Sequence, residues 1–149
     1  MADLIKIRKA TQADAGVIRS LVIAGRINPS GLNWRRFVVA CLPDGEVIGC
    51  GQIKSHRDGS WEMASITVKR SWRGQGIARA MIDSLLSSFN GDLYLMCRSK
   101  HTGLYEGFGF RVIDEDEMPR YFRKVKQLAR LSELLLSEGE HLVIMKRAV

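Results

Sequence analysis

Hydrophobic and polar positions alternate with a period of two at the start of the chain, and a helical pattern follows. Residues 4–10, LIKIRKA, alternate apolar and polar side chains, as in a strand with one buried face. Thr11 and Asp14 have the spacing of a helix-capping pair, and apolar residues then recur three and four apart as far as Gly25. The first 25 residues therefore predict a strand followed by a helix.

Residues 37–68 show the pattern of an antiparallel meander. Two apolar runs within residues 37–56 are joined at residues 43–45, PDG, a strong hairpin signal. Residues 57–60, RDGS, mark a second turn, and residues 61–68, WEMASITV, alternate as a third strand. The first half of the chain thus predicts one helix and four strands.

The second half alternates between helical and strand patterns. Apolar residues from Ile77 to Phe89 recur at helical spacing, and residues 93–98, LYLMCR, form a continuous apolar run suited to a central strand. The remaining expected elements are a short helix at 102–108, a strand at 110–114, a long helix at 119–137 and a closing strand at 141–149.

The helix at residues 119–137 is strongly two-sided. Its apolar side is expected to hold Tyr121, Val125, Leu128 and Leu135. Its other side is expected to hold Arg120, Arg123, Lys124, Gln127 and Arg130.

This order of elements predicts the fold class. A meander followed by strand, helix, strand crossovers gives an α/β (α+β) fold: a mixed, mostly antiparallel sheet with helices on both faces. No repeat or linker divides the chain, so residues 1–149 are expected to form a single domain.

Composition excludes several other classes. The 149 residues are 46% hydrophobic and 26% charged, which is typical of a globular protein with a real core. No apolar run resembles a signal peptide or a membrane span, so we expect a cytoplasmic protein with no membrane association. The three cysteines and three histidines show no metal-ligand spacing, so no metal is expected.

The net charge of +7 implies an acidic partner of some kind. The stretch at residues 73–78, RGQGIA, begins at the last of three basic residues within 69–73 and opens into an amphipathic helix. Glycines let a backbone approach a ligand closely, and amides at a helix start are unpaired donors with partial positive charge. This stretch is therefore interpreted as a phosphate cradle.

Known phosphate-binding patterns narrow that interpretation. A Walker loop needs Lys followed by Ser or Thr after its second glycine, and none follows here. A dinucleotide fingerprint needs a third glycine where Arg79 stands. A structural alternative is that the two glycines simply make a tight turn.

A third pattern, Arg/Gln-x-x-Gly-x-Gly/Ala, fits Arg73, Gly76 and Ala78. Together with LYEGFGF at residues 104–110, it resembles the GNAT superfamily of acyl-CoA-dependent N-acyltransferases. The resemblance covers nearly the whole chain and is most specific from Glu62 to Phe110. It implies an acetyl-CoA cosubstrate and transfer of the acetyl group to a primary amine by direct attack.

The resemblance also implies which residues bind the coenzyme. The loop and the helix start would hold the pyrophosphate, and the end of the preceding strand would pair its free backbone groups with pantetheine. The coenzyme-binding residues so implied are Ile66, Thr67, Val68, Arg73, Gly74, Gln75, Gly76, Ile77, Ala78 and Arg79.

Two residues are expected to be catalytic. Tyr105 stands where GNAT enzymes carry the general acid that assists the sulfur leaving group. Glu62 is the candidate base, because strict alternation would place it with Ile66 and Val68 on one partly buried face, although a strand bulge would change that facing. A water chain is the alternative, and Asp58 and residues 114–117 are weaker candidates.

The acceptor amine is left open. Many relatives carry an asparagine before the tyrosine helix, where this chain has Arg98 and Ser99. Residues 104–122 resemble the tail of N-acetylglutamate synthase-type GNAT domains more weakly, and an acidic amino acid would suit Arg35, Arg36 and Arg98. A protein N-terminus, a lysine side chain or an antibiotic amine fits equally.

Two other function classes stay in view. The basic side of the helix at 119–137 could bind nucleic acid, although few aromatic residues accompany it. A non-catalytic acyl-CoA sensor is the second alternative. The closing strand and the long helix also offer surfaces on which related proteins form homodimers.

Overall fold

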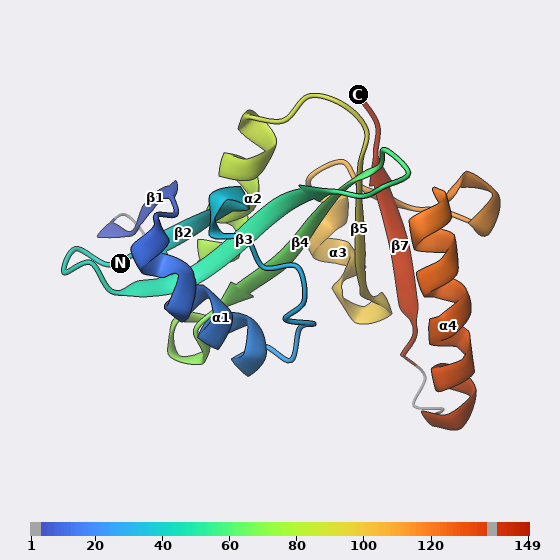
Figure 1. The fold of residues 1–149 in the computed structure, drawn as a ribbon, viewed down its shortest axis with the longest axis horizontal. Helices are drawn as coiled ribbons and strands as arrows, with labels where there is room; N and C mark the ends of the chain where they lie inside the picture. The colour runs from blue at the N-terminus through green and yellow to red at the C-terminus, as the bar shows by residue number, and fades with distance from the viewer. Residues whose placement is uncertain (1–3, 137–139) are drawn as a thin grey trace. The chain divides into compact units, whose positions relative to one another are not determined.

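The computed structural model describes residues 4–136 and 140–149, with the side chains of 132–139 outside that description. Its helices and strands follow the predicted order (Figure 1). The strands are β1 (Lys6–Lys9), β2 (Phe37–Cys41), β3 (Val47–Ser55), β4 (Trp61–Val68), β5 (Leu93–Arg98), β6 (Arg111–Val112) and β7 (Leu142–Arg147). The α-helices are α1 (Ala15–Ala24), α2 (Ile77–Ser87), α3 (Thr102–Glu106) and α4 (Arg120–Leu136).

The strands hydrogen-bond in the order β1-β2-β3-β4-β5-β7-β6. The pairs β1–β2, β2–β3, β5–β7 and β6–β7 are antiparallel, whereas β4 and β5 are parallel with Glu62 opposite Tyr94. This parallel step is the one connected through α2, as a crossover requires. The predicted mixed, mostly antiparallel sheet is therefore confirmed, with β5 in an interior position.

The chain divides into two compact units. One comprises residues 1–54 and 63–89, and the other comprises residues 55–62 and 90–149. The phosphate-cradle candidate lies in the first unit, and the acid and base candidates lie in the second.

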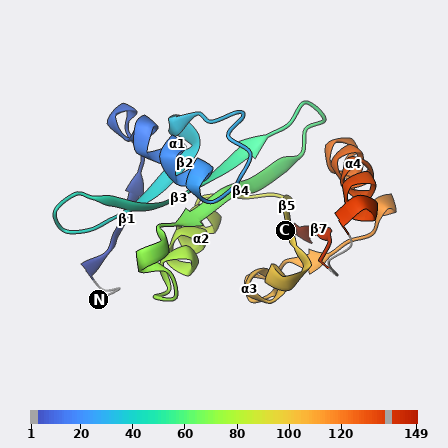
Figure 2. The same ribbon diagram turned by 90° about the horizontal axis from the view of Figure 1, so that it is seen from below.

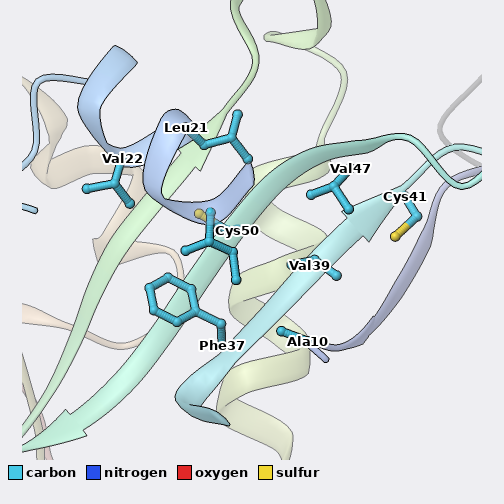
Figure 3. Packing of buried hydrophobic residues seen from close by; sticks show 9 residues of the cluster. Ala10, Leu21, Val22, Phe37, Val39, Cys41, Val47 and Cys50 are labelled. Carbon is cyan, nitrogen blue, oxygen red and sulfur yellow. The ribbon is translucent and has the colours of Figure 1, made fainter. Parts of the chain in front are cut away.

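In the first unit, helices cover both faces of the sheet. Phe37 and Val39 of β2 belong to a buried cluster with Leu21 and Val22 of α1 (Figure 3). Ala40 of β2 belongs to a different cluster, which contains Ile77 and Met81 of α2. Neighbouring residues of one strand point to opposite faces, and Figure 2 accordingly shows α1 and α2 on opposite sides of β2 and β3.

Two glycines of β3 let α2 approach the sheet closely. A Cβ at Gly49 would lie 3.1 Å from the backbone oxygen of Thr67 and 3.1 Å from Met81 Cε. A Cβ at Gly51 would lie 2.5 Å from Ile66 Cδ1. The absence of side chains at these positions thus provides space for β4 and for the buried side of α2.

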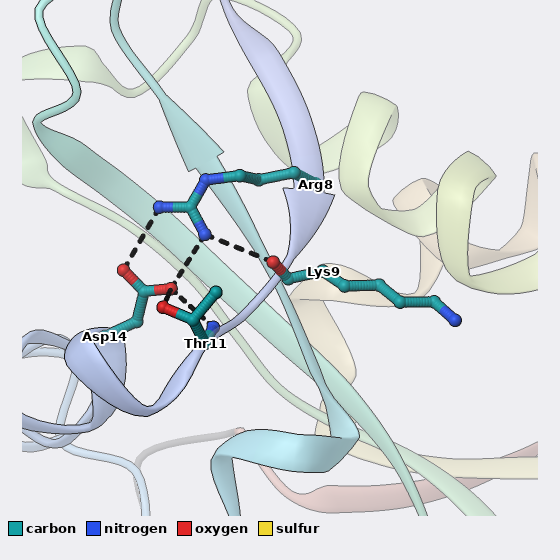
Figure 4. A network of polar contacts seen from close by, with 4 residues as sticks. All are labelled: Arg8, Lys9, Thr11 and Asp14. Carbon is teal, nitrogen blue, oxygen red and sulfur yellow. Dashed lines mark hydrogen bonds and ion pairs between the residues drawn. The ribbon is translucent and has the colours of Figure 1, made fainter.

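The start of the first unit is fixed by a polar network around Asp14 (Figure 4). Arg8 Nη1 donates to Asp14 Oδ2 over 2.7 Å, and Arg8 Nη2 donates to Oδ1 over 3.1 Å. The Thr11 amide donates to Asp14 Oδ2 over 2.7 Å, as the capping pattern predicts. These interactions, with the Arg8 hydrogen bonds the strongest cause, lower the pKa of Asp14 to about 2.

In the second unit, α3 and α4 lie on opposite sides of β7 (Figure 2). Phe122 of α4 is fully buried in a cluster with Tyr94 of β5 and Ile144 of β7. On the other side, Arg147 Nε of β7 donates to the carbonyl of Phe108 over 2.9 Å, which fixes the segment after α3.

Two helix expectations need correction. Leu128 does not lie on the buried side of α4, because 67% of its surface is exposed. The helix is rotated so that Phe122 and Val125 face inward; Leu135 lies outside the described side chains. Phe89 lies beyond the end of α2, whose buried positions are Ile77, Met81, Ile82 and Leu85.

Candidate functional site

The glycine loop has the backbone conformation that the phosphate-cradle hypothesis needs. Gly74 and Gly76 have φ angles of +79° and +80°. Residues other than glycine adopt this region at a cost of about 1–2 kcal/mol. A Cβ built at either glycine would meet nothing within 4 Å. The glycines are therefore not explained by crowding within the chain, and their open side is free for a ligand.

The loop leads directly into the N-terminus of α2. Gly76 is the N-cap, and the amide of Ala80 donates to the Gly76 carbonyl over 3.1 Å. The preceding amides, from Ile77 to Arg79, have no acceptor within the helix. Ile77 is only 3% exposed and packs with Met81, so the helix start is anchored in the core. An anchored helix start with unpaired amides suits a phosphate group.

Arg73 is the charged residue best placed on this loop. Its Nε donates to the carbonyl oxygen of Val68 over 3.0 Å, while the side chain remains exposed. No described residue bonds its two Nη groups, which are therefore available for an anion. Gln75 and Arg79 are also exposed beside it.

The end of β4 differs from expectation in one respect. The carbonyl of Val68 was expected to be free for pantetheine, yet it already accepts the Arg73 bond. A carbonyl oxygen has a second lone pair, so another donor can still bind it. Ile66 packs against the α2-side cluster, and Thr67 is buried under Gly25 of the α1 end.

The regular alternation of β4 is interrupted at Ser65. Its φ angle is +60°, although it is not a glycine, and its hydroxyl accepts a 3.0 Å bond from Gln52 Nε2. Strict alternation therefore does not hold across β4, and the facing of Glu62 cannot be inferred from that of Ile66 and Val68. An interruption of this kind, like the strand bulge considered above, changes which face a residue points to.

Glu62 is buried and paired with a residue that sequence reasoning did not single out. Glu62 Oε1 lies 2.8 Å from His56 Nε2, and the two side chains are 4% and 12% exposed. The His56 ring stacks on Tyr121 of α4, with ring centroids 3.6 Å apart and planes 15° from parallel. Burial, and then the Glu62 charge, raises the pKa of Tyr121.

The turn that carries His56 is itself attached to α4. The Tyr121 amide donates to Asp58 Oδ2 over 2.9 Å, so the carboxylate satisfies an unpaired amide at the helix N-terminus. Ser60 donates to the other Asp58 oxygen from both its amide and its hydroxyl. Asp58 is therefore occupied as a helix cap.

Tyr105 lies on α3 and is partly buried. Its ring meets Phe110 edge-on, with centroids 6.2 Å apart. Burial, with a smaller contribution from nearby Cys97, raises its pKa to about 12. Tyr105 consequently keeps its proton throughout the physiological pH range.

Several of the other polar candidates take part in surface contacts. Glu117 pairs with Arg111 at 2.6 Å, and Glu115 pairs with Arg130 at 2.6 Å. Arg98 lies 3.6 Å from Glu140, and the Arg35 guanidinium lies 4.5 Å from the centre of the Trp34 ring. Ser99 accepts at its hydroxyl from the His141 amide. These contacts leave the acceptor-binding roles of Arg35, Arg36 and Arg98 as predictions.

Within residues 4–136 and 140–149, no group of three or more His, Cys, Asp or Glu side chains is arranged to hold a metal ion. In that part of the chain, no helix combines the length and apolarity needed to cross a bilayer.

Comparison with known proteins gives one family match. The model of the acetyltransferase (GNAT) domain matches residues 33–112, which include β2 to β6. That range contains the glycine loop, Glu62 and Tyr105. A comparison with curated protein sequences finds no significant match.

Solved structures share the fold over nearly the whole chain. Rv2747 from Mycobacterium tuberculosis, solved in complex with CoA, has a TM-score of 0.71 and 24% identity, covering 97% of this chain and 99% of that one. N-acetylglutamate synthase from Neisseria gonorrhoeae, complexed with coenzyme A and N-acetyl-glutamate, has a TM-score of 0.69 and 20% identity. The match covers 97% of this chain but only 35% of the synthase. Ard1 from Thermoplasma volcanium has a TM-score of 0.67 and 14% identity, covering 98% of both chains.

Proposed function

Because the chain belongs to the acetyltransferase (GNAT) domain family, we propose that it transfers an acetyl group from acetyl-CoA to a primary amine by direct attack. The observation that carries the proposal is the loop at the start of α2. Two glycines with positive φ, open space above them, and unpaired amides suit the coenzyme pyrophosphate. In this proposal Arg73 adds charge-assisted bonds through its Nη groups.

The amine must be neutral when it attacks. A lysine-like amine has a pKa of about 10.4, so a base has to remove one proton at or before attack. We assign this task to the buried pair of Glu62 and His56, directly or through a water molecule. The amine nitrogen then bonds to the thioester carbon, and the carbon–sulfur bond breaks.

Tyr105 assists the departure of sulfur in this proposal. With a pKa of about 12 it is a neutral hydrogen-bond donor, but it is a weaker acid than a thiol, whose pKa is about 8.5. Complete transfer to a free thiolate would therefore be uphill on its own. We infer that Tyr105 gives its proton to sulfur only as it recovers one from the attacking nitrogen.

Tyr105→Phe tests the proposal. The variant should bind acetyl-CoA as the wild type does and lose about 100-fold or more in kcat, because only the assisting hydroxyl is removed. Tyr94→Phe, at a buried tyrosine of the same unit, is the matched control and should keep wild-type turnover. The high pKa also predicts no fall in kcat from Tyr105 ionisation below about pH 11.

Isothermal titration with acetyl-CoA and single-turnover kinetics measure the two quantities separately. Equal turnover in wild type and Tyr105→Phe would remove Tyr105 from the mechanism. Coenzyme binding without turnover for any amine would instead favour the acyl-CoA sensor.

Amino acids are the first acceptors we propose to test. Among the structural neighbours, the synthase was solved with N-acetyl-glutamate, a product of acetylation at an α-amine. A panel of L-glutamate, L-glutamine, a peptide with a free N-terminus and a lysine-containing peptide separates amino-acid acceptors from protein acceptors. Activity confined to the peptides would contradict an amino-acid acceptor.

A further inference from the structure

The pair of His56 and Glu62 holds two groups that can accept protons, and they differ in access to solvent. The Glu62 side chain is 4% exposed, while the His56 side chain keeps 12% of its surface exposed. Both lie in the same compact unit, His56 in the turn after β3 and Glu62 at the start of β4. A proton arriving from a substrate therefore meets the imidazole more readily than the carboxylate.

The 2.8 Å contact also fixes which nitrogen is basic. An ionised carboxylate can only accept hydrogen bonds, so His56 Nε2 must carry the hydrogen that lies toward Glu62. In a neutral imidazole the other nitrogen, Nδ1, then has a free lone pair. No described residue donates to Nδ1. The arrangement is that of an oriented base, in which a carboxylate fixes the tautomer of an imidazole.

We propose that His56 Nδ1 takes the proton from the acceptor amine, and that Glu62 is a positioning residue that holds His56 in the required tautomer. The proposal deepens the proposed acetyl transfer and rests on it. It changes the expected role of Glu62 from that of the base to that of the partner of the base.

Charged and aromatic groups from two elements interact with the ring. These groups are the Glu62 carboxylate, the Asp58 carboxylate on the same turn, and the rings of Tyr121 and Phe122 of α4. The Tyr121 stack and the bond between its amide and Asp58 also hold the ring in one plane.

The proton balance of the reaction is complete with this assignment. The ammonium gives one proton to His56 Nδ1, and the neutral nitrogen forms a bond to the thioester carbon. The carbon–sulfur bond breaks, and its electron pair stays on sulfur. Sulfur receives a proton through Tyr105, which recovers one from the attacking nitrogen as the amide forms. His56 then releases its proton to water, so the net products are the amide, CoA thiol and one proton.

Two substitutions separate the roles of the residues in the pair. His56→Gln keeps an amide donor that can reach Glu62 but has no basic lone pair, so kcat should fall about 100-fold or more. Glu62→Gln keeps an oxygen that accepts from Nε2, so kcat should fall less, by about 10-fold. His141→Gln changes an exposed histidine and should leave kcat unchanged. All three should bind acetyl-CoA like the wild type in isothermal titration.

The proposal is tested by which of the two variants, His56→Gln or Glu62→Gln, loses more kcat. A larger loss in Glu62→Gln than in His56→Gln would make the carboxylate the base and overturn the inference. The pH profile adds a readout that a structural role would not move. The acid limb of kcat should be present in wild type and lost in His56→Gln, and an unchanged limb in that variant would contradict the proposal.

A measurement without substrate keeps the test independent of the reaction. Nitrogen-15 NMR of the ligand-free protein above pH 8 should show His56 with hydrogen on Nε2 and none on Nδ1. Hydrogen on Nδ1 would overturn the proposal whatever the enzyme turns over. If the Nε2 tautomer is present but the wild type neither binds acetyl-CoA nor acetylates any amine of the panel, the proposed function fails while the assigned geometry stands.

Discussion

Asp14 shows how one buried carboxylate connects a sequence signal to stability. The capping pattern pointed to its bond with the Thr11 amide, but nothing in the pattern identified Arg8 as the partner of both carboxylate oxygens. That pairing arises because the register of β1 brings Arg8 beside the helix start. Because this pairing lowers the pKa of Asp14 to about 2, it makes the stability of the protein depend on pH.

Asp14→Asn should lower the free energy of unfolding by about 1–2 kcal/mol at pH 7, because Arg8 loses its charged partner. The Asp14 pKa is depressed in the folded state, so this contribution is present above about pH 4 and is lost as the pH falls through about 2. Urea unfolding at pH 7 and at pH 3 should therefore show a smaller difference between wild type and variant at the lower pH.

Asp83→Asn serves as the control for Asp14. Asp83 lies on the exposed side of α2 and hydrogen-bonds to no described residue, so this change should stay within about 0.5 kcal/mol. A pH-independent difference for Asp14→Asn would show that its effect comes from packing rather than from charge.

The catalytic candidates illustrate what residue patterns can and cannot reveal. Tyr105 and the glycine loop were found because each sits in a short motif with fixed spacing. His56 was missed because its partners come from β4 and α4, and Tyr121 is 65 positions away along the chain. A histidine six residues before a strand glutamate has no local signal; only the fold brings the pair together.

At the scale of elements, hydrophobic periodicity predicted most helices and strands, and its failures have local causes. The alternation in β4 fails at Ser65, because one residue with positive φ interrupts the two-residue repeat. The apolar side of α4 was misplaced because Leu128 has the right spacing, yet the fully buried Phe122 sets the rotation of the helix. A sequence pattern shows which residues are apolar, but it does not show which of them is buried most deeply.

The closeness of α2 to β3 provides an element-scale prediction. Gly49→Ala should destabilise the fold by about 1–3 kcal/mol, because the new methyl would lie 3.1 Å from the Thr67 carbonyl oxygen, a backbone atom that cannot turn aside. Thermal or urea unfolding of the purified variant measures this cost.

Gly16→Ala is the matched control for Gly49→Ala. Gly16 lies on α1 with nothing within 4 Å of a built Cβ, so alanine should stabilise the helix by about 0.5–1 kcal/mol. The two glycines should thus respond with opposite signs. Equal effects would mean that close packing is not what requires Gly49.

At the scale of the whole molecule, the family match confirms the resemblance first suggested by the glycine loop and the tyrosine motif. The basic residues that give the net charge of +7 have more than one role. On α4, Arg130 pairs with Glu115, and Arg123 donates to the carbonyls of Glu115 and Met118. Part of the basic side proposed for nucleic acid is thus engaged within the protein, which weakens that alternative.

The coenzyme is the partner on which the whole account depends, and its proposed cradle is a feature of backbone conformation. Gly76→Asp would introduce a side chain and a negative charge where the pyrophosphate is proposed to bind. Gly45→Asp makes the same change in the hairpin between β2 and β3, where Gly45 also has a positive φ of +92° and open space. Both variants place a residue other than glycine at a positive φ, but only Gly76→Asp changes the proposed cradle.

The most direct measurement is therefore a thermal melt of wild type, Gly76→Asp and Gly45→Asp, each with and without acetyl-CoA. At about a hundredfold excess over Kd, a ligand bound only to the folded state adds about 2.7 kcal/mol, which should raise Tm by roughly 5–10 °C. The account predicts this shift in wild type and Gly45→Asp and none in Gly76→Asp. No shift in wild type, or an equal shift in Gly76→Asp, would contradict it.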